Sequence, residues 1–430
     1  MSPRLTSIES YSLAETSSCR AMAEEAKAAS RLLAVATGEA RNAWLLRSAA
    51  GLRQRSDEIL AANALDLGEA TTAGLNAAAI ERLTLSATRI DGMAHTLLEV
   101  AALPDPLGEV VTSSRRPNGL EVRQVRVPLG VIFMIYESRP NVTIDAAGLC
   151  VKSGNAVILR GGKEALRTNL ALYRVLADEL APCGLPEAAV QLISTVDRSA
   201  VGELLALADL IDLAIPRGGE SLIRRVVAEA TMPVLKHYQG NCHVYVDGRC
   251  DVDMAINIIL NAKVERPGVC NAAEKLLVHQ AIAADFLPRA CEALLAEGVE
   301  LRGDAASREI VPAIKAAEPA DWDTEYLDKI LAIAIVHSIE QAISHIAAHG
   351  SGHTDAIVTA DLASAQEFIA RVDSSAVMVN ASTRFNDGGQ LGMGAEIGIS
   401  TDKIHARGPC GLRELTSTKW IVIGSGHIRE

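Results

Sequence analysis

The sequence predicts an α/β protein with two doubly wound parallel-sheet domains and a small β arm that projects from them. From residue 130 onward, short continuous apolar runs alternate with helical stretches across glycine turns. Continuous apolar strands separated by helices are typical of parallel sheets that are covered on both faces. Residues 120–127 instead alternate apolar and polar side chains, which is typical of a strand with one solvent-exposed face. The length gives room for about three domains.

The N-terminal part is predicted to be helical from about residue 13 to residue 100. Alanine, leucine, arginine and glutamate dominate it, and runs of β-branched residues are few. The segment LPDPLG over 103–108 ends this region, because its prolines do not continue a helix.

The alternating strand over 120–127 has a candidate partner near the C-terminus, in residues 419–423. Both stretches stand apart from the strand and helix units between them. We therefore expect residues 113–128 and 412–430 to form a projecting β arm that contacts another subunit. The expected assembly is a homo-oligomer, either a dimer or a tetramer.

The first doubly wound domain is expected to contain four apolar strands with helices between them. The strands are predicted at 131–136, 156–160, 190–193 and 210–215, and the helices at 145–151, 164–180, 199–207 and 221–230. Ligands bind such sheets at the carboxyl ends of the strands. Residues 1–112 and 129–242 are therefore expected to supply the N-terminal helices and a dinucleotide-binding domain.

A second α/β unit begins where the chain passes Gly240. Its predicted elements are a strand at 243–246, a helix at 252–262, an apolar run at 272–279, and strands at 332–336, 356–359 and 376–380. Residues 243–411 are expected to form the catalytic domain.

Composition excludes several classes of function. The formal net charge of -12 argues against sequence-independent binding to nucleic acid or to an anionic membrane. No run of about 18 apolar residues could span a bilayer, and residues 1–15 lack the apolar core of a secretory signal. The eight cysteines form neither a C-x-x-C pair nor a zinc-ligand pattern, so no metal is predicted. Reduced thiols and a cytoplasmic location are expected.

One cysteine stands on a turn. In ERPGVCNA, residues 265–272, the Pro267-Gly268 pair forces a turn that delivers Cys270, and an apolar run follows. A cysteine displayed in this way can be a nucleophile. The alternative is a small buried side chain, since free cysteine is often buried.

Two glycine pairs follow predicted strands and precede predicted helices. One is Gly161-Gly162, between Arg160 and Lys163, and the other is Gly218-Gly219. Glycines at such turns let backbone N–H groups face a phosphate. Neither turn matches a G-x-G-x-x-G fingerprint or a Walker loop, so a plain strand-to-helix turn remains the alternative.

Several stretches together resemble the aldehyde dehydrogenase superfamily and, within it, the γ-glutamyl phosphate reductases. They are ESRPNVTIDAAG and NAVILRGGKEA within 127–165, ERPGVCNA at 265–272, GSGHTDAIVT at 350–359, and STRFNDGG within 379–409. The resemblance covers nearly the whole chain. It implies an aldehyde dehydrogenase-like fold, with Cys270 as the nucleophile. It also places Asn141 in the oxyanion hole, together with the Cys270 backbone N–H.

The resemblance further implies a nicotinamide cofactor. Arg160 stands where related enzymes place a lysine that contacts the adenosine ribose, and Glu325 aligns with the glutamate that holds the nicotinamide ribose. Lys163 stands where NAD-preferring relatives often carry a glutamate on the ribose hydroxyls. A cation there suits a 2′-phosphate, so NADPH is expected. Arg160 and Lys163 could instead be solvated charges, Asn141 a turn cap and Glu325 a surface ion pair.

The implied reaction is the reduction of L-glutamyl 5-phosphate to L-glutamate 5-semialdehyde through a cysteine thioester, a step of proline biosynthesis. A hydrolytic aldehyde dehydrogenase is the alternative. Its general-base glutamate lies in an ELGGK segment, whereas the matching residues here are HYQGN at 237–241, with no carboxylate. His237 could take the role of the base, although a structural histidine is the expected reading.

The substrate carries a phosphate, a carboxylate and an ammonium group. Arg384, Arg266 and Arg139 are candidates for the two anions because the guanidinium fork suits them, and Asp387 is a candidate for the ammonium. Glu265 stands where the branch commonly has glutamine, and a carboxylate beside the nucleophile would disfavour the thiolate. The kinase that makes the acyl phosphate, glutamate 5-kinase, would be a separate polypeptide and a possible partner.

Overall fold

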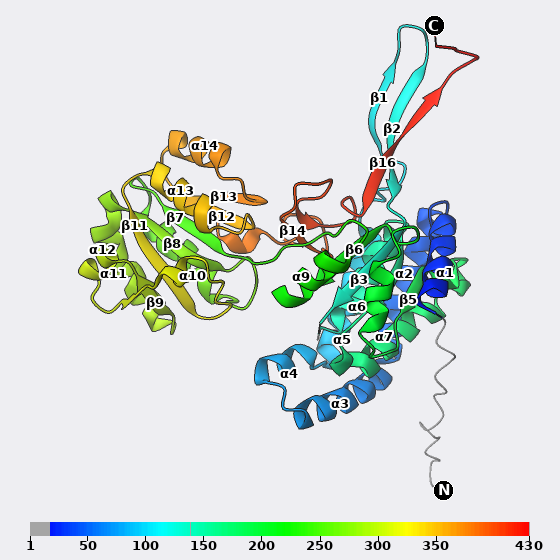
Figure 1. Ribbon diagram of the computed structural model, residues 1–430, viewed down its shortest axis with the longest axis horizontal. Coiled ribbons are helices and arrows are strands. Elements are labelled where there is room, and N and C mark those ends of the chain that lie inside the picture. Colours follow the sequence, from blue (N-terminus) through cyan, green and yellow to red (C-terminus); the bar gives the residue numbers. More distant parts are fainter. Residues whose placement is uncertain (1–17, 138, 430) are drawn as a thin grey trace.

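The computed structural model describes residues 18–137 and 139–429. The predicted helical start at residues 13–17, the segment 1–15 without a secretory signal, and residue 430 of the predicted arm lie outside these residues. Figure 1 shows two α/β bodies side by side, with a narrow β arm rising from the right-hand body, which carries the N-terminal helices. Among the described residues, no helix combines the length and apolar character that a membrane span needs.

Helices cover the N-terminal region, as predicted. They are α1 (Cys19–Leu33), α2 (Gly38–Gln54), α3 (Ser56–Thr72), α4 (Ala77–Leu83) and α5 (Ala87–Ala102). Polar side chains cap four of them at the N-terminus, namely Ser18, Thr37, Asn76 and Ser86. Helix α5 ends directly before the LPDPLG segment, which confirms the predicted stop.

The first parallel sheet has the strand order β5-β4-β3-β6. Its strands are β3 (Val131–Tyr136), β4 (Ala156–Arg160), β5 (Val190–Leu192) and β6 (Leu213–Arg217). The helices that follow them are α6 (Asn141–Lys152), α7 (Leu166–Asp178), α8 (Ser199–Leu205) and α9 (Glu220–Glu229), with short 3-10 turns η1 (Lys163–Ala165), η2 (Ala181–Cys183) and η3 (Glu187–Ala189). Every residue of β3 is buried, as a continuous apolar run predicts.

Two predicted boundaries in this sheet differ from the structure. Helix α6 begins at Asn141 rather than at residue 145, because Pro140 already has a helical φ of -56° and favours a first turn there. Strand β6 begins at Leu213 rather than at residue 210. The backbone N–H groups of Leu210 and Ile211 instead close a turn onto the carbonyl of Leu207.

The second sheet is parallel and has the strand order β10-β9-β11-β8-β7-β12-β13. Its strands are β7 (Cys242–Val246), β8 (Ala273–His279), β9 (Glu300–Gly303), β10 (Lys315–Ala316), β11 (Ile330–Val336), β12 (Thr354–Val358) and β13 (Ala376–Val379). The helices are α10 (Val252–Val264), α11 (Gln280–Ala296), α12 (Ala305–Ile310), α13 (Ile339–His349) and α14 (Leu362–Arg371), with turns η4 (Pro319–Trp322) and η5 (Thr383–Phe385). All four strands predicted here are present as β7, β11, β12 and β13; the apolar run at 272–279 forms β8, and β9 and β10 are additional.

The arm is a three-stranded antiparallel sheet in the order β1-β2-β16. Strand β2 (Glu121–Pro128) pairs with β16 (Thr416–Ile423), so the predicted partnership of the two distant stretches is confirmed. The outer strand β1 (Val110–Arg115) was not predicted, and it begins before residue 113, the expected start of the arm. Its six residues are all exposed, so its sequence carries no alternating pattern.

A small hairpin of β14 (Gly398–Ser400) and β15 (Gly408–Cys410) leads from the second body back to the arm. Its apolar residues Ile397, Ala406 and Cys410 are buried in the core of the first body. This segment therefore packs with the dinucleotide-binding unit, although the predicted catalytic domain extends to residue 411. The division of the chain into functional domains stays a prediction.

Candidate active site

Cys270 lies in the turn between α10 and β8, as the Pro267-Gly268 pair predicts. The Ala272 N–H donates to the Val269 carbonyl at 3.0 Å and closes the turn. Strand β8 then runs through the middle of the seven-stranded sheet, between β11 and β7. The cysteine is half-buried. It therefore stands at the amino end of a central strand and keeps access to solvent.

Two histidines lie beside the Cys270 sulfur. His237 comes from the segment between α9 and β7, and His353 directly precedes β12. One ring nitrogen of each and the Cys270 Sγ all lie within 4.8 Å of one another. The two rings meet edge to face, with centroids 5.2 Å apart.

Hydrogen bonds fix the orientation of both rings. The Nδ1 of His237 lies 2.9 Å from the Ile399 carbonyl oxygen, so this nitrogen must be the protonated one. The Nδ1 of His353 lies 2.7 Å from the hydroxyl oxygen of Thr354. These contacts leave the Nε2 atom of each ring for the sulfur. His353 is fully buried, and its Nε2 has no hydrogen-bond partner among the described residues.

The surroundings of Cys270 favour the thiolate. Burial raises the pKa of the Cys270 thiol, but the nearby imidazoles of His353 and His237 outweigh burial and lower it well below its usual range. In return, burial lowers the pKa of His237, yet contact with the Cys270 sulfur raises it above its ordinary value overall. Such a thiolate and imidazolium pair is the state in which a cysteine attacks an acyl group.

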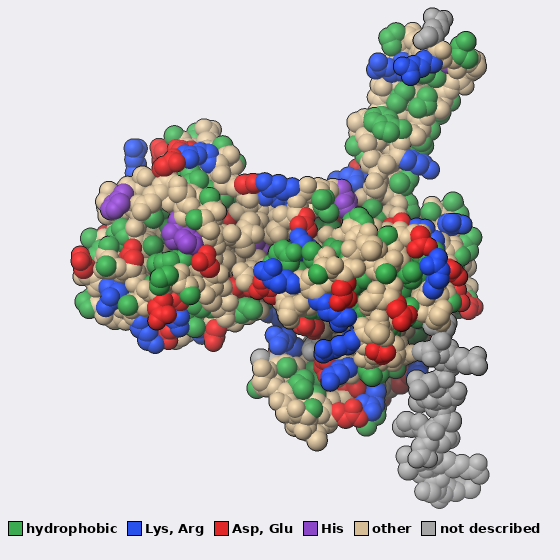
Figure 2. Space-filling model, in the orientation of Figure 1, with side chains coloured by type: hydrophobic (Ala, Val, Ile, Leu, Met, Phe, Trp, Pro, Cys, Tyr) green, Lys and Arg blue, Asp and Glu red, His purple; other side chains and the backbone are tan. Residues whose placement is uncertain are grey.

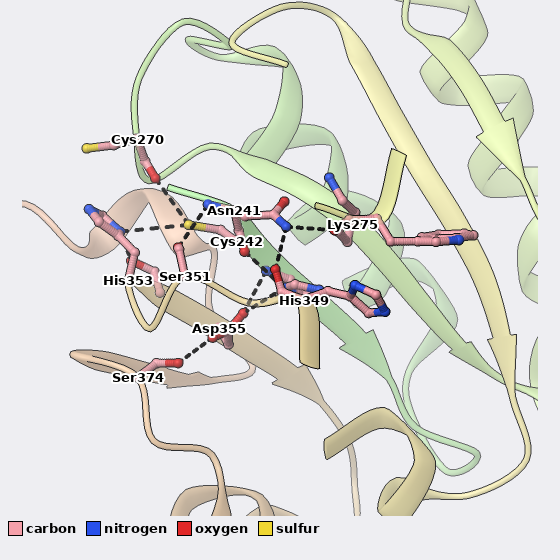
Figure 3. A network of polar contacts seen from close by, with 12 residues as sticks. Asn241, Cys242, Cys270, Lys275, His349, Ser351, His353, Asp355 and Ser374 are labelled. Atoms are coloured by element: carbon pink, nitrogen blue, oxygen red, sulfur yellow. Dashed lines mark hydrogen bonds and ion pairs between the residues drawn. The ribbon is translucent and has the colours of Figure 1, made fainter. Parts of the chain in front are cut away.

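The backbone around the nucleophile is closely packed. A Cβ atom on Gly240 would stand only 1.8 Å from the Cys270 carbonyl oxygen, so this position has no space for a side chain. The Gly240 N–H donates to Glu325 Oε1 at 2.8 Å. The Cys242 thiol donates to the Cys270 carbonyl at 3.1 Å, and Figure 3 shows that the Cys270 sulfur points away from Cys242.

Glu325 thus touches the segment that packs against the nucleophile. Burial raises the pKa of the Glu325 carboxyl, the Gly240 N–H lowers it, and the Cys270 thiolate raises it further. The sequence analysis expects this residue to hold the nicotinamide ribose. In the structure its described partner is a backbone group beside Cys270, and its second carboxylate oxygen remains for a ligand.

Asn141 stands at the first position of α6. Its side-chain nitrogen donates to Asp145 Oδ2 at 2.9 Å, which uses one of its two N–H groups and leaves the other for an oxyanion. Burial raises the pKa of Asp145 to about 6, against the opposing effects of Asn141 and Arg217.

The four candidates for substrate binding fall into two groups. Arg384 and Asp387 make local contacts: the Arg384 guanidinium donates to the Asn271 side chain, and Asp387 Oδ1 accepts the backbone N–H of Gly389 at 2.9 Å. Arg266 and Arg139 are exposed, and neither forms an ion pair within the described residues.

Arg139 lies in a positively charged neighbourhood. Although the residue as a whole is exposed, desolvation of its guanidinium lowers its pKa, and the charges of Arg217, Arg82 and Arg266 lower it further. The same surroundings include the Cys270 thiolate, which raises the pKa of Arg139. Arginines held close together beside a nucleophile are suited to anionic substrate groups.

Glu265 does not face the nucleophile alone. Its Oε2 lies 3.4 Å from Arg384 Nε, and the same oxygen accepts from the Asn261 side chain at 3.3 Å. A cation therefore accompanies this carboxylate. The principal influences on the pKa of the Cys270 thiol are burial and the two histidines.

The predicted cofactor residues lie at the carboxyl end of β4. Arg160 ends the strand, and Lys163 opens the short helix that leads into α7. A Cβ atom on Gly161 would stand 2.1 Å from the Asn169 side chain, so this turn is narrow. The Arg160 Nε is buried without a hydrogen-bond partner in the described chain, and the Lys163 ammonium is exposed and forms no ion pair there. These cationic groups fit the phosphate of a dinucleotide.

The second glycine pair already faces an anion. Gly218 and Gly219 precede α9, and the Gly219 N–H donates to Glu137 Oε2 at 3.0 Å. A carboxylate from the end of β3 thus occupies the helix N-terminus that a phosphate would use. A cofactor phosphate can bind there only when Glu137 moves aside.

Three contributors to this site were given no role in the sequence analysis. The GSGHTDAIVT stretch was recognised as a match, but no role was assigned to its His353. Arg82, in α4, lies in no motif, and Arg217, at the end of β6, precedes the second glycine pair but was given no role. Only the fold brings residues 237, 270 and 353 together, because they belong to three distant parts of the chain.

Comparisons with known proteins agree on the family. Residues 4–318 match the model of the aldehyde dehydrogenase family. A gamma-glutamyl phosphate reductase from Rhodopirellula baltica is 58% identical over 411 residues, covering 96% of this chain and 95% of the relative. Another from Syntrophomonas wolfei is 54% identical, covering 94% of this chain and 97% of the relative.

Solved structures give the same result. The crystal structure of gamma-glutamyl phosphate reductase from Thermotoga maritima has a TM-score of 0.95 and 46% identity, covering 96% of this chain and 100% of that one. The enzyme from Saccharomyces cerevisiae has a TM-score of 0.54 and 31% identity, covering 96% and 99%. An acetylating aldehyde dehydrogenase from Geobacillus thermoglucosidasius, at 18% identity and a TM-score of 0.68, shares the fold. The chain therefore belongs to the gamma-glutamyl phosphate reductases, within the aldehyde dehydrogenase family.

Proposed function

We propose that this chain reduces L-glutamyl 5-phosphate to L-glutamate 5-semialdehyde and phosphate with NADPH, as the second step of proline biosynthesis from glutamate. The observation that carries the proposal is the half-buried Cys270 thiolate between two imidazoles, in a chain of the gamma-glutamyl phosphate reductase family. A stabilised thiolate suits attack on an acyl phosphate, whose phosphate departs readily.

The Cys270 Sγ attacks the acyl carbon, and the C–O bond to phosphate breaks, which leaves a thioester. When bound, the nicotinamide cofactor would supply the hydride that reduces the thioester carbonyl. The Cys270 backbone N–H and the free N–H of Asn141 stabilise the negative charge on the carbonyl oxygen. When the C–S bond then breaks, His237 and His353 stabilise the departing thiolate, and the aldehyde is released.

His237 replaces the carboxylate base that would favour hydrolysis of the thioester over its reduction. It stands where the resemblance places the general-base glutamate of hydrolytic aldehyde dehydrogenases. Its Nδ1 donates to the Ile399 carbonyl, and its pKa, lowered by burial but raised more by the Cys270 sulfur, is above the ordinary value. Once Cys270 is acylated, the thiolate charge that raises this pKa is gone, so the preference for reduction rests on the absence of a carboxylate base from residues 237–241.

The cofactor is proposed to bind along the carboxyl end of β4. Arg160, Gly161, Gly162 and Lys163 would hold its adenosine half, and Glu325 would reach the nicotinamide ribose. The exposed cation of Lys163 and the unpartnered Arg160 Nε favour a 2′-phosphate, and hence NADPH over NADH. Gly218 and Gly219 would join the cofactor site once Glu137 releases the Gly219 N–H.

The substrate anions are proposed to bind Arg266, Arg139 and Arg384. Arg266 and Arg139 suit this role best, since neither forms an ion pair with a carboxylate within the described chain. Asp387 would accept the substrate ammonium through its Oδ2, because its Oδ1 already accepts backbone N–H groups.

We also propose a cytoplasmic homo-oligomer that receives its substrate from glutamate 5-kinase. All eight cysteines are free, which suits a reducing compartment. Acyl phosphates hydrolyse in water, so a kinase close by would limit their loss.

The reverse reaction tests the proposal. Purified enzyme is given glutamate semialdehyde and NADP⁺, with and without inorganic phosphate, and NADPH formation is followed by absorbance. Turnover should require phosphate, because phosphate must release the acyl group from Cys270. Turnover without phosphate would instead identify a hydrolytic aldehyde dehydrogenase. Cys270→Ala should abolish turnover and leave cofactor binding intact, and residual turnover in that variant would remove the thioester from the mechanism.

A further inference from the structure

The Cys270, His237 and His353 cluster has the donor set of a soft divalent metal site. Thiolate sulfur and imidazole nitrogen are the two preferred ligand types of zinc. The three donor atoms lie within 4.8 Å of one another. In a tetrahedral zinc site with bonds of about 2.0–2.3 Å, ligand atoms lie about 3.3–3.6 Å apart. A contraction of at most about 1.5 Å by the half-buried Cys270 and His237 side chains would therefore close the site.

The hydrogen bonds on the far side of the two histidine rings are like those that hold metal-bound histidines. Metal-bound histidines usually hold their other ring nitrogen in a hydrogen bond, which fixes the tautomer and aims the free nitrogen at the metal. Here the Ile399 carbonyl holds Nδ1 of His237 at 2.9 Å, and the Thr354 hydroxyl lies 2.7 Å from Nδ1 of His353. Both Nε2 atoms are thereby left for a common ligand.

His353 supplies an independent indication of a ligand. Its side chain is fully buried, and its Nε2 has no hydrogen-bond partner among residues 18–137 and 139–429. A buried ring nitrogen without a partner is costly, and coordination to a cation would satisfy it.

The three residues leave one coordination position open. Among the described residues, no further histidine, cysteine or carboxylate joins the three donor atoms, so no protein side chain completes a closed structural site. Sites with three protein ligands keep the fourth position for water or a small molecule. A metal there would occupy the sulfur lone pair that attacks the substrate.

We propose that Cys270, His237 and His353 form a zinc-binding site, and that zinc bound there reversibly blocks the nucleophile. Zinc and the acyl substrate then exclude one another, so zinc is a competitive inhibitor. Metal binding follows from the cluster alone, whereas inhibition also rests on the proposed function of Cys270.

Cobalt(II) tests the binding directly, because thiolate ligation to cobalt gives a charge-transfer absorption in the near ultraviolet. The full-length enzyme titrated with Co²⁺ alone should show this band, saturating at one metal per chain, and added Zn²⁺ should remove it. The band should be absent in Cys270→Ala. His353→Gln and His237→Gln should each weaken cobalt binding by more than about 100-fold. Mutation of a residue that only hydrogen-bonds to a metal ligand already lowers metal affinity by about 10- to 100-fold, and loss of a ligand should cost more.

His337→Gln is the matched control. That histidine is exposed and bonds to Gln280, away from the cluster, so the variant should bind cobalt as the parent does. Circular dichroism checks that each variant is folded. If His353→Gln does not fold, the half-buried His237→Gln carries the test. The proposal is overturned if cobalt gives no thiolate band, or if His353→Gln and His237→Gln both bind cobalt with the affinity of the parent enzyme.

Inhibition kinetics distinguish a failure of the metal-site proposal from a failure of the proposed function. Zinc should raise the apparent KM for the acyl substrate without lowering kcat, and it should slow alkylation of Cys270. Cobalt ligation by Cys270 without any inhibition by zinc would confirm the metal site and contradict the nucleophilic role of the cysteine. Inhibition with no thiolate band would place the zinc elsewhere and overturn the site.

Discussion

At the residue scale, the reactivity of Cys270 depends on two side chains that its own motif does not contain. His237 and His353 approach the sulfur from separate segments, and each is oriented by a contact on its far nitrogen. Burial alone would raise the pKa of the thiol and keep it protonated and unreactive, so the two histidines are what favours the thiolate.

The pH dependence of alkylation tests this point. Because burial is outweighed by the histidines and the Cys270 pKa is well below its usual range, the thiolate persists at neutral pH. The rate of iodoacetamide labelling should therefore stay near its maximum at pH 7 and fall only in acid. In His353→Gln the midpoint should move upward, and labelling at pH 7 should slow by about tenfold for each unit by which the midpoint exceeds 7. Peptide mass spectrometry measures the rate at Cys270. Identical pH profiles in the two proteins would show that His353 does not stabilise the thiolate.

Gly240 gives a second test at this scale. A methyl group there would stand 1.8 Å from the Cys270 carbonyl oxygen, so Gly240→Ala must displace the nucleophile's backbone. A displacement of about 1 Å costs on the order of 100-fold in rate, and kcat/KM should fall by about that much.

Gly92→Ala is the control for that substitution. Gly92 lies in α5, and an added Cβ would meet nothing within 4 Å. This variant should keep full activity and gain up to about 1 kcal/mol of stability, because alanine favours a helix over glycine. Equal activity of the two variants would show that the close approach to Gly240 is unimportant.

The sequence predicted the nucleophile but only part of its surroundings. Pro267 and Gly268 specify a turn locally, so Cys270 could be located without the fold. His353 has no local signal of function, because its role depends on the neighbouring strands β7 and β12. His237 was expected to be structural, since sequence alone does not show how close it comes to Cys270.

At the element scale, β8 connects the nucleophile to a buried ionic cluster. Its residue Glu274 forms an ion pair of 2.9 Å with Lys263 of α10, and both side chains are fully buried. The other Glu274 oxygen accepts the Leu327 N–H at 3.3 Å, and Lys275 donates to the Thr324 carbonyl at 2.7 Å. The cluster therefore holds the loop that carries Glu325.

Removal of one partner of this pair should destabilise the fold. In Lys263→Met, Glu274 becomes a buried carboxylate without its closest cation, and such a loss costs about 3–5 kcal/mol. The free energy of unfolding in urea measures the change. The double variant Lys263→Met, Glu274→Gln should recover part of the loss, because no buried carboxylate then remains at residue 274. A loss below about 1 kcal/mol in the single variant would show that water or Lys275 compensates.

Element positions were predictable where the pattern was local. Strand β3 is a continuous apolar run and was placed correctly, whereas β1 is exposed at all its residues and has no pattern to find. Strand β6 was placed too early because Leu210 and Ile211 are apolar, although they belong to a turn. The pairing of β2 with β16 was predictable because both stretches stood outside the regular strand and helix units.

At the scale of the whole molecule, the arm extends well beyond both α/β bodies and carries apolar side chains into solvent (Figures 1 and 2). Trp420, Val422 and Ile423 of β16 are 63%, 56% and 47% exposed. Exposed apolar residues on an edge strand are typical of a surface that pairs with another chain. This surface supports the homo-oligomer expected from the sequence, which stays a prediction.

Charge on the arm should separate the subunits. Trp420→Lys with Val422→Lys places two like charges on one face of β16 and should shift the protein toward monomer in sedimentation velocity experiments. Ser417→Lys is the control, since this exposed residue lies outside the apolar patch. An unchanged sedimentation coefficient in the double variant would exclude the arm as the subunit contact.

The most direct test is to trap the acyl-enzyme. The enzyme is mixed with L-glutamyl 5-phosphate, generated in place by a kinase, in the absence of NADPH, and both released phosphate and intact mass are measured. The account predicts a burst of one phosphate per chain and a glutamyl adduct that peptide mapping assigns to Cys270. Phosphate release that waits for NADPH, or an adduct on a different side chain, would contradict it.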